Sequence, residues 1–264
     1  MHGISTRPAG RQVLFMATCL CDAFYDDAAR AAVEVLEYLG CEVIFPEAQT
    51  CCGQPAFNAG DWKASRMVVR HSAQVFAGDL PIIVPSGSCA AMFLHGAGLE
   101  FEGEPDREVI HNLAGRTWEL FDYIVNGLGI ESWPGTYAKR VAFHRSCHTR
   151  GTDSGPAAIK LLESIDGLTL VPFGEGEQCC GFGGTFSVSF PNVSERMGDL
   201  KIDHVLEARP DVLATGDMGC LMHLEGLAQR KERPISMVHA AQVLKGSVVG
   251  ETGEWQKKAE VTSS

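Results

Sequence analysis

One pattern of cysteines occurs twice in the chain, and this duplication constrains the fold more than any other feature. In each copy a single cysteine precedes an adjacent pair that is followed by glycine, and a fourth cysteine comes later. The offset between the copies is 128 residues for the first three cysteines (19 to 147, 51 to 179, 52 to 180) and 131 residues for the fourth (89 to 220). The repeat therefore predicts two related half-domains.

Four thiols brought together from separate loops suit a zinc ion or an iron–sulfur cluster, since both prefer thiolate ligands. Buried structural thiols are the usual role of a lone cysteine, but that role does not account for two matched sets. We therefore predict one metal site in each half. The predicted ligands are Cys19, Cys51, Cys52 and Cys89 in the first half and Cys147, Cys179, Cys180 and Cys220 in the second.

Composition and charge are those of an ordinary globular protein. Of the 264 residues 45% are hydrophobic and 21% are charged, which allows a core in one or two domains. The net charge of −11 argues against nucleic-acid partners, whose binding needs basic surfaces. No apolar run approaches the roughly 20 residues of a membrane span, and the start lacks a signal-peptide pattern. We expect a cytoplasmic protein whose cysteines do not form disulfides.

Short apolar runs alternate with segments of helical periodicity in the same order in both halves. In the first half we predict strands over 13–17, 42–45 and 81–84 and helices over 26–39, 61–77 and 117–127. In the second half we predict strands over 141–144, 168–171 and 212–215 and helices over 156–165, 194–208 and 235–244. Such alternation favours parallel sheets with right-handed crossovers.

In a parallel sheet the loops beyond the carboxyl ends of the strands lie along one edge, and the repeated cysteines fall in these loops. The predicted fold is α/β, with two duplicated half-domains that each contain a small parallel sheet flanked by helices. The predicted divisions are a first cysteine-rich domain (1–128), a Gly- and Pro-containing linker (129–139), a second cysteine-rich domain (140–246) and a flexible polar tail (247–264).

Adjacent cysteines can bind one metal assembly only if the backbone between them turns sharply. Gly53 and Gly181 follow the two pairs and permit such a turn. Two further cysteines lie outside the repeat. Cys41 opens a predicted strand and is interpreted as a core thiol, whereas Cys21 is either a core thiol or an extra ligand.

These motifs, with C-x31-CCG in both copies, resemble the cysteine-rich CCG domain. That domain occurs in heterodisulfide reductase, in the iron–sulfur subunits of glycolate oxidase and anaerobic glycerol-3-phosphate dehydrogenase, and in the lactate-utilisation protein A family. The resemblance covers nearly all of residues 11–245 and is greatest to the last of these families. The segments that carry it include FPEAQTCCGQPAFNAG (45–60), FHRSCHTRG (143–151), CCGFGGTFSV (179–188) and TGDMGCLMHLEG (215–226).

The resemblance implies an oxidoreductase subunit with two [4Fe–4S] clusters that transfers electrons while a complex oxidises L-lactate to pyruvate. It also implies a ferredoxin-type iron–sulfur partner and a further lactate-utilisation subunit, with membrane contact only through partners. One departure concerns the fifth cysteine of each heterodisulfide reductase site. Met92 and His223 stand at those positions here, and of the two we expect His223 to lie near its site. Four thiolates are sufficient for an ordinary [4Fe–4S] cluster.

His144 and His148 flank Cys147 and are candidates for hydrogen bonds to cluster sulfurs or for proton transfer. The alternative is that they are loop histidines that satisfy backbone groups. Three functional alternatives also stay open at this stage. They are a glycolate oxidase-type iron–sulfur subunit, a heterodisulfide- or thiol-linked reductase, and a colourless zinc-binding scaffold, for which four thiolates are equally suitable.

Overall fold

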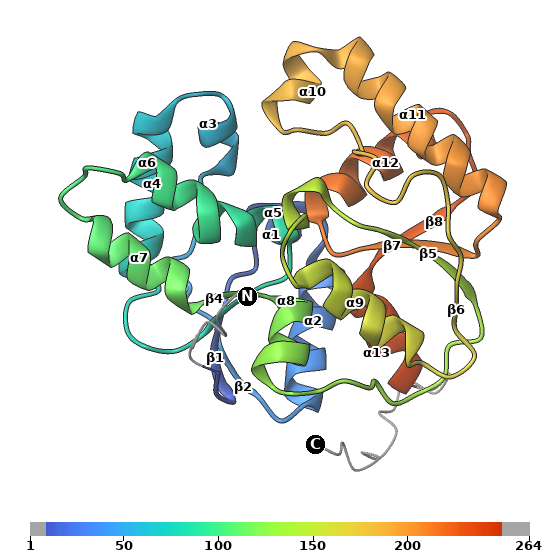
Figure 1. The fold of residues 1–264 in the computed structure, drawn as a ribbon, viewed down its shortest axis with the longest axis horizontal. Coiled ribbons are helices and arrows are strands. Elements are labelled where there is room, and N and C mark those ends of the chain that lie inside the picture. Colours follow the sequence, from blue (N-terminus) through green and yellow to red (C-terminus); the bar gives the residue numbers. More distant parts are fainter. Residues whose placement is uncertain (1–8, 250–264) are drawn as a thin grey trace.

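Each half of the molecule contains a four-stranded, fully parallel sheet (Figure 1). The computed structural model describes residues 9–249. The first sheet has the order β2-β1-β3-β4 and the second has the order β6-β5-β7-β8, so the halves share one topology. The strands are β1 (Gln12–Phe15), β2 (Glu42–Ile44), β3 (Ile82–Val84), β4 (Thr117–Glu119), β5 (Arg140–His144), β6 (Thr169–Leu170), β7 (Val212–Thr215) and β8 (Ser236–His239).

Helices connect the strands, and the α/β fold of two duplicated half-domains is confirmed. The first half contains α1 (Cys19–Phe24), α2 (Asp26–Tyr38), α3 (Gln54–Asn58), α4 (Trp62–Val75), α5 (Gly87–Ala91), the π-helical turn η1 (Met92–Gly96), α6 (Ala97–Glu100), α7 (Arg107–Arg116), α8 (Leu120–Asp122) and the π-helical turn η2 (Tyr123–Gly127). The second half contains the 3-10 turn η3 (Cys147–Thr149), α9 (Ser154–Glu163), α10 (Thr185–Ser189), α11 (Pro191–Ala208), α12 (Met218–Arg230) and α13 (Ala240–Val248).

The structure corrects the segment that closes each half. Helices were expected over 117–127 and 235–244, but β4 and β8 occupy the first part of each segment. Trp118 is in register with Ile83 of β3, and Val238 is in register with Ala214 of β7. A short apolar run that is buried on both sides has no periodicity that separates strand from helix. The helical expectation holds only for the residues after each strand.

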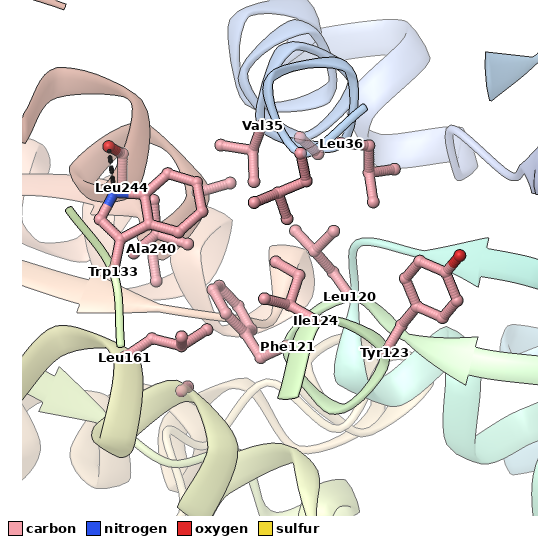
Figure 2. Packing of buried hydrophobic residues seen from close by; sticks show 14 of the residues in the cluster. Val35, Leu36, Leu120, Phe121, Tyr123, Ile124, Trp133, Leu161, Ala240 and Leu244 are labelled. Atoms are coloured by element: carbon pink, nitrogen blue, oxygen red, sulfur yellow. Dashed lines mark hydrogen bonds between the residues drawn. The ribbon is translucent and has the colours of Figure 1, made fainter. Parts of the chain in front are cut away.

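The largest hydrophobic cluster contains side chains from both halves (Figure 2). The helix that closes each half packs against the first long helix of the other: α13 lies against α2, and α8 lies against α9. Val35 of α2, Phe121 of α8, Leu161 of α9 and Leu244 of α13 all belong to this cluster. The two sheets therefore share one core, and this fixes the position of one half relative to the other.

The segment predicted as a linker is part of this core. Trp133 is 1% exposed, and its Nε1 donates hydrogen bonds to Leu244 O and Ser247 Oγ, both at 3.0 Å. Helix α13 extends to Val248, two residues into the predicted tail, and Ser247 O also accepts a hydrogen bond from Thr136 N. Residues 250–264 of that tail lie outside the described residues. No helix within 9–249 is long and apolar enough to span a membrane.

Candidate metal centres

The first four predicted ligands lie together at the carboxyl edge of the first sheet. Cys19 opens α1 directly after β1, the adjacent pair follows β2, and Cys89 lies in α5 after β3. The Sγ atoms of Cys19 and Cys51 are 3.8 Å apart, and Cys52 hydrogen-bonds to both Cys51 and Cys89. We call these four side chains the first quartet. The sequence separates them by up to 70 residues (19 to 89), and the parallel sheet brings them to one place.

The second quartet repeats this arrangement after β5, β6 and β7. Cys147 lies in η3, the adjacent pair lies in the loop after β6, and Cys220 lies in the first turn of α12. Cys179 hydrogen-bonds to both Cys147 and Cys180, and the Sγ atoms of Cys180 and Cys220 are 3.0 Å apart. The structure thus groups all eight predicted side chains into two sets of four. Their role as ligands stays a prediction.

Hydrogen bonds within each quartet separate the pKa values of its thiols. Hydrogen bonds from Cys19 and Cys52 lower the pKa of Cys51, whereas donating those bonds raises the pKa of Cys19 and Cys52. Cys179 stands in the same relation to Cys147 and Cys180. In each set these hydrogen bonds therefore favour one thiolate, Cys51 or Cys179, over the thiols that donate to it. A bound metal or cluster of high positive charge would stabilise further thiolates as ligands.

The glycine after each pair is required by the backbone. Gly53 and Gly181 have φ angles of 91° and 94°, in the left-handed region that other residues rarely adopt. Their N–H groups lie 3.5 Å from Cys51 Sγ and 3.3 Å from Cys179 Sγ, so each turn also aims a donor at a thiol. A Cβ on Gly181 would lie 2.5 Å from Ser194 O of α11, a distance that the packing does not permit.

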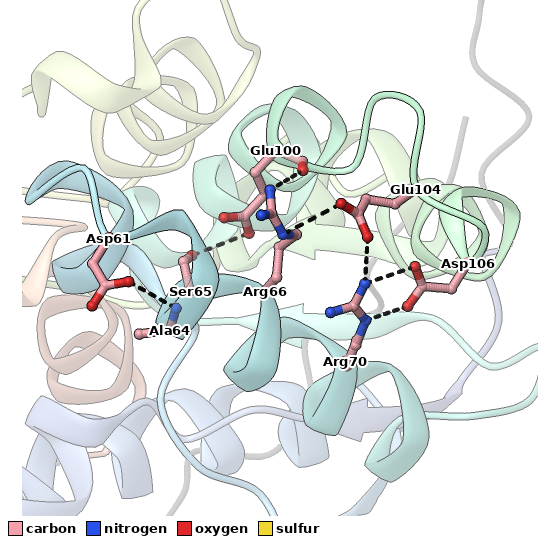
Figure 3. Close-up of polar contacts among 8 residues, drawn as sticks. All are labelled: Asp61, Ala64, Ser65, Arg66, Arg70, Glu100, Glu104 and Asp106. Atoms are coloured by element: carbon pink, nitrogen blue, oxygen red, sulfur yellow. Dashed lines mark hydrogen bonds and ion pairs between the residues drawn. The ribbon is translucent and has the colours of Figure 1, made fainter.

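The helix behind the first turn is held by a network of ion pairs (Figure 3). Ser65 Oγ of α4 lies 3.3 Å from Gly53 O and 3.1 Å from the buried carboxyl of Glu100. Arg66 donates to Glu100 O at 2.9 Å, and Arg70 pairs with Glu104 and Asp106. This network connects α4 to the α6–α7 region and so supports the loop that carries the first cysteine pair.

Both quartets line a single cavity of about 290 Å³. Helix α3 contributes Gln54 and Asn58 to its wall, and α10 contributes Thr185 and Val188. These two short helices each follow a cysteine pair, α3 after Gly53 and α10 after Gly184, and they belong to different halves of the molecule (Figure 1). The sequence predicted two sites but not that they face the same space. The cavity follows from the shared core, which orients the two sheet edges toward one another.

The two histidines beside Cys147 have different positions. His148 lines the cavity, with Nδ1 3.7 Å from Cys147 Sγ. His144 lies behind the second quartet, 1% exposed, and a ring nitrogen lies within 4.8 Å of the sulfurs of Cys180 and Cys220. Its Nδ1 is 3.1 Å from Lys201 Nζ, and burial, with the neighbouring lysine, lowers its pKa to about 3.

The donor set tests whether a sulfur-rich group fits here. Each quartet offers the four thiols that a [4Fe–4S] cluster takes as thiolate ligands, so the residues present fit such a cluster. Behind the second quartet, His144 Nε2 is buried and has no hydrogen-bond partner within residues 9–249, but His144 does not line the cavity.

The remaining candidate side chains lie away from the cavity wall. Cys21 is fully buried in the hydrophobic cluster under α12, and burial raises the pKa of its thiol to about 12. Cys41 belongs to the shared core. Met92 packs in the first half against Gly96, with its sulfur directed at that glycine. His223 Nε2 lies 3.4 Å from both Ser194 Oγ and Ser194 O, behind the second cysteine turn.

Sequence reasoning missed two buried polar residues at the second site. Asp217 accepts hydrogen bonds from Cys220 N at 3.1 Å and from Ser88 N of the other half at 2.6 Å. Its position three residues before the fourth cysteine is a helix N-cap signal that could have been detected. Lys201 is fully buried in α11. The only sign of its burial in the sequence is that it lies on the same face of the helix as Ser194, Gly198 and Val205, which are buried.

Comparison with known proteins agrees with this architecture. The chain matches the family described as "Cysteine-rich domain" (CCG) over residues 13–94 and 141–225, which include both quartets. It is 44% identical over 235 residues to "Lactate utilization protein A" of Geobacillus thermodenitrificans, covering 88% of this chain and 98% of that protein. The protein of the same name from Bacillus licheniformis is 45% identical over 235 residues, with the same coverage.

A more divergent relative, "Lactate utilization protein A 2" of Bacillus cereus, is 38% identical over 236 residues, covering 88% of this chain and 97% of that protein. The crystal structure of a hypothetical protein from Helicobacter pylori superposes with a TM-score of 0.60 at 15% identity, covering 96% of this chain and 51% of that chain. At that identity the likeness concerns the fold alone. The sequence matches show that the chain belongs to the CCG cysteine-rich domain family and, within it, to the lactate utilization protein A family.

Proposed function

We propose that this chain is the iron–sulfur subunit of a lactate-utilisation system and carries electrons while the complex oxidises L-lactate to pyruvate. Each quartet would hold one [4Fe–4S] cluster. The observation that carries the proposal is the convergence of two complete sets of four thiols on one cavity, in a chain whose relatives are named for lactate utilisation. The family and the names of its related members support lactate utilisation, and the chemistry of the thiol donors supports the cluster.

When bound, a [4Fe–4S] cluster accepts or donates one electron at a time. The chain's own residues supply the ligands and the surroundings of that cluster. The N–H groups of Gly53 and Gly181 each donate toward one cysteine sulfur of their quartet. His148 lies at the cavity wall within 3.7 Å of Cys147 Sγ. Hydrogen bonds of this kind stabilise the more negative, reduced state of a cluster.

Removal of two electrons and two protons from a hydroxy acid requires a group that the sequence does not reveal. We therefore assign that step to a partner, with a ferredoxin-type iron–sulfur subunit and a further lactate-utilisation subunit completing the complex. We also infer a cytoplasmic location. All ten cysteines are free thiols, and the sulfurs of Cys180 and Cys220 lie 3.0 Å apart as thiols. A reducing compartment keeps such pairs open.

The proposal is tested by anaerobic purification followed by iron, sulfide and zinc analysis, with EPR of the dithionite-reduced protein. We expect about eight iron and eight sulfide per chain, matching two four-iron clusters. Cys51→Ser and Cys179→Ser should each remove about half of the iron and one reducible signal. Stoichiometric zinc without sulfide, repeated after anaerobic cluster reconstitution, would refute the proposal and favour the zinc scaffold.

The shared cavity favours one second candidate, a thiol- or disulfide-linked reductase. A space of about 290 Å³ between two sulfur sets could admit a small disulfide. Neither Met92 nor His223, at the positions of the fifth cysteines, lines that cavity. Consumption of a disulfide by the reduced, cluster-loaded chain would support this candidate. An electron carrier should instead reduce an artificial acceptor and leave the disulfide unchanged.

A further inference from the structure

The second quartet has a buried basic side chain behind it. Lys201 of α11 is fully buried, and its Nζ lies 3.1 Å from His144 Nδ1 and 5.0 Å from the centre of the Phe173 ring. His144 in turn places a ring nitrogen within 4.8 Å of the sulfurs of Cys180 and Cys220. The lysine therefore contacts the histidine, and the histidine lies beside two of the four ligand candidates.

A buried ammonium requires a negative partner, because desolvation of an isolated charge is costly. Among residues 9–249, no carboxylate forms an ion pair with Lys201. Burial lowers the pKa of Lys201 to about 8, and the thiols of the second quartet, Cys180, Cys220 and Cys179, oppose this shift. A cluster bound by the second quartet would supply the negative charge that balances this ammonium.

The first half has no such pair at the related positions. His144 corresponds to Met16 by the 128-residue offset that relates Cys147 to Cys19. Ser194 of α11 lies against Gly181, and Ser65 of α4 lies against Gly53 in the same way. Lys201 follows Ser194 at the same distance in sequence as Ser72 follows Ser65, so Ser72 is the residue that corresponds to Lys201. Met16 and Ser72 are both buried and uncharged. The two halves thus share the predicted ligands but differ in the buried charge behind them.

The buried ionisable side chain beside the first turn is a carboxyl, and no cation forms an ion pair with it among the described residues. Glu100 is 1% exposed, bonds to Ser65, and has Arg66 and Arg70 as its neighbouring cations. Arg70 is itself paired with acidic side chains. Arg116, the other buried cation of the first half, donates to Phe76 O and Leu80 O before the start of β3, at the edge of the sheet away from the cysteines. The two sites differ electrostatically although their thiols are arranged alike.

We propose that Lys201, positioned by His144, makes the cluster of the second quartet the more readily reduced of the two, so that electrons pass from the first quartet to the second. This inference rests on the proposed function. A cluster with four thiolate ligands is an anion that gains one more negative charge on reduction, and a nearby fixed cation stabilises the reduced form more. In the transfer step the first cluster loses one electron and the second gains it, and no bond is broken.

The test is an EPR-monitored redox titration of the anaerobically reconstituted full chain. Lys201→Gln removes the charge and keeps a donor for His144 Nδ1, whereas Lys201→Arg keeps the charge. Lys160→Met, an exposed lysine on α9, is the control for the loss of one positive charge. The Cys51→Ser variant identifies the signal that belongs to the second quartet.

In Lys201→Gln we expect the ratio of reduced to oxidised second cluster to fall at least tenfold at fixed potential, which is about 59 mV for a one-electron couple. The potential at which the first quartet's signal titrates should be unchanged, and Lys160→Met should change the potential of neither signal. Lys201→Arg should keep the wild-type order. If Lys201→Gln fails to fold, Lys201→Met provides the same comparison in an apolar form.

Two clusters with unchanged potentials in Lys201→Gln would overturn this inference and leave the proposed function intact. Wild-type protein without iron and sulfide would overturn both. Loss of the second cluster in all three Lys201 variants would show that the residue is needed for assembly rather than for the potential, and would also overturn the inference.

Discussion

Replacing Gly181 with alanine tests the link between the CCG turn and the metal site. The φ angle of Gly181 is 94°, and an added Cβ would lie 2.5 Å from Ser194 O and 2.9 Å from Met197 Cβ. Gly60 has a φ of 79° with nothing within 4 Å of its Cβ position. Both alanine variants therefore carry the backbone cost of a positive φ, and only Gly181→Ala also carries a steric clash.

The magnitude follows from these two contributions. A left-handed conformation costs a residue other than glycine about 1–2 kcal/mol, and we expect this loss of unfolding free energy in Gly60→Ala. Moving α11 away from the cysteine turn adds the cost of overpacking, about 1–3 kcal/mol. Gly181→Ala should therefore lose about 2–5 kcal/mol. Because the turn positions Cys179 and Cys180, the variant should also retain only about four iron atoms per chain.

Two measurements decide the outcome. Urea denaturation of both metal-free variants gives the change in unfolding free energy, and iron analysis after anaerobic reconstitution gives the cluster content. Equal destabilisation of Gly181→Ala and Gly60→Ala, with about eight iron atoms retained in both, would refute the reasoning. It would show that α11 yields to the added methyl group without moving the cysteines.

Two further predictions concern the shared core. Burial raises the pKa of Glu119 from 4.5, its value in the unfolded chain, to about 8. Folding therefore takes up a proton between these two pH values, and the stability of the protein falls as the pH rises through this range. At about 1.36 kcal/mol per pH unit, the gain in unfolding free energy from Glu119→Gln should be about 3 kcal/mol larger at pH 7 than at pH 4.5. Denaturation curves of the two proteins that show no such pH dependence would contradict this. Trp133→Phe removes the Nε1 donor to Leu244 O and Ser247 Oγ and should lower the unfolding free energy by about 1–3 kcal/mol, whereas an unchanged urea midpoint would show that these bonds contribute little.

Local patterns in the sequence were sufficient for the first three strands of each half, for α2, α4, α9 and α11, and for the grouping of both quartets, but not for α7 or α12. Residues that are close in sequence are enough to predict the strands before Cys19 and Cys147 and the turns at the glycine after each pair. Each of these patterns occurs in both halves, which makes it easier to recognise. The fourth strands were missed because Trp118 and Val238 lie in short apolar runs that favour a strand only when β3 or β7 is available as a partner. That availability is a property of the folded sheet.

The cysteine spacing and the strand pattern were enough to predict two sets of four thiols at the carboxyl edges of two related sheets. Strand direction and residue spacing dictate that result, and both are fixed by the chain. That the two sets line one cavity depends on the packing of α13 against α2 and α8 against α9, which no local pattern encodes. The same holds for Lys201, which lies fully buried beside His144. A lysine on a helix is ordinarily solvated, and its burial here results from contacts between segments more than 50 residues apart in the chain (144 and 201).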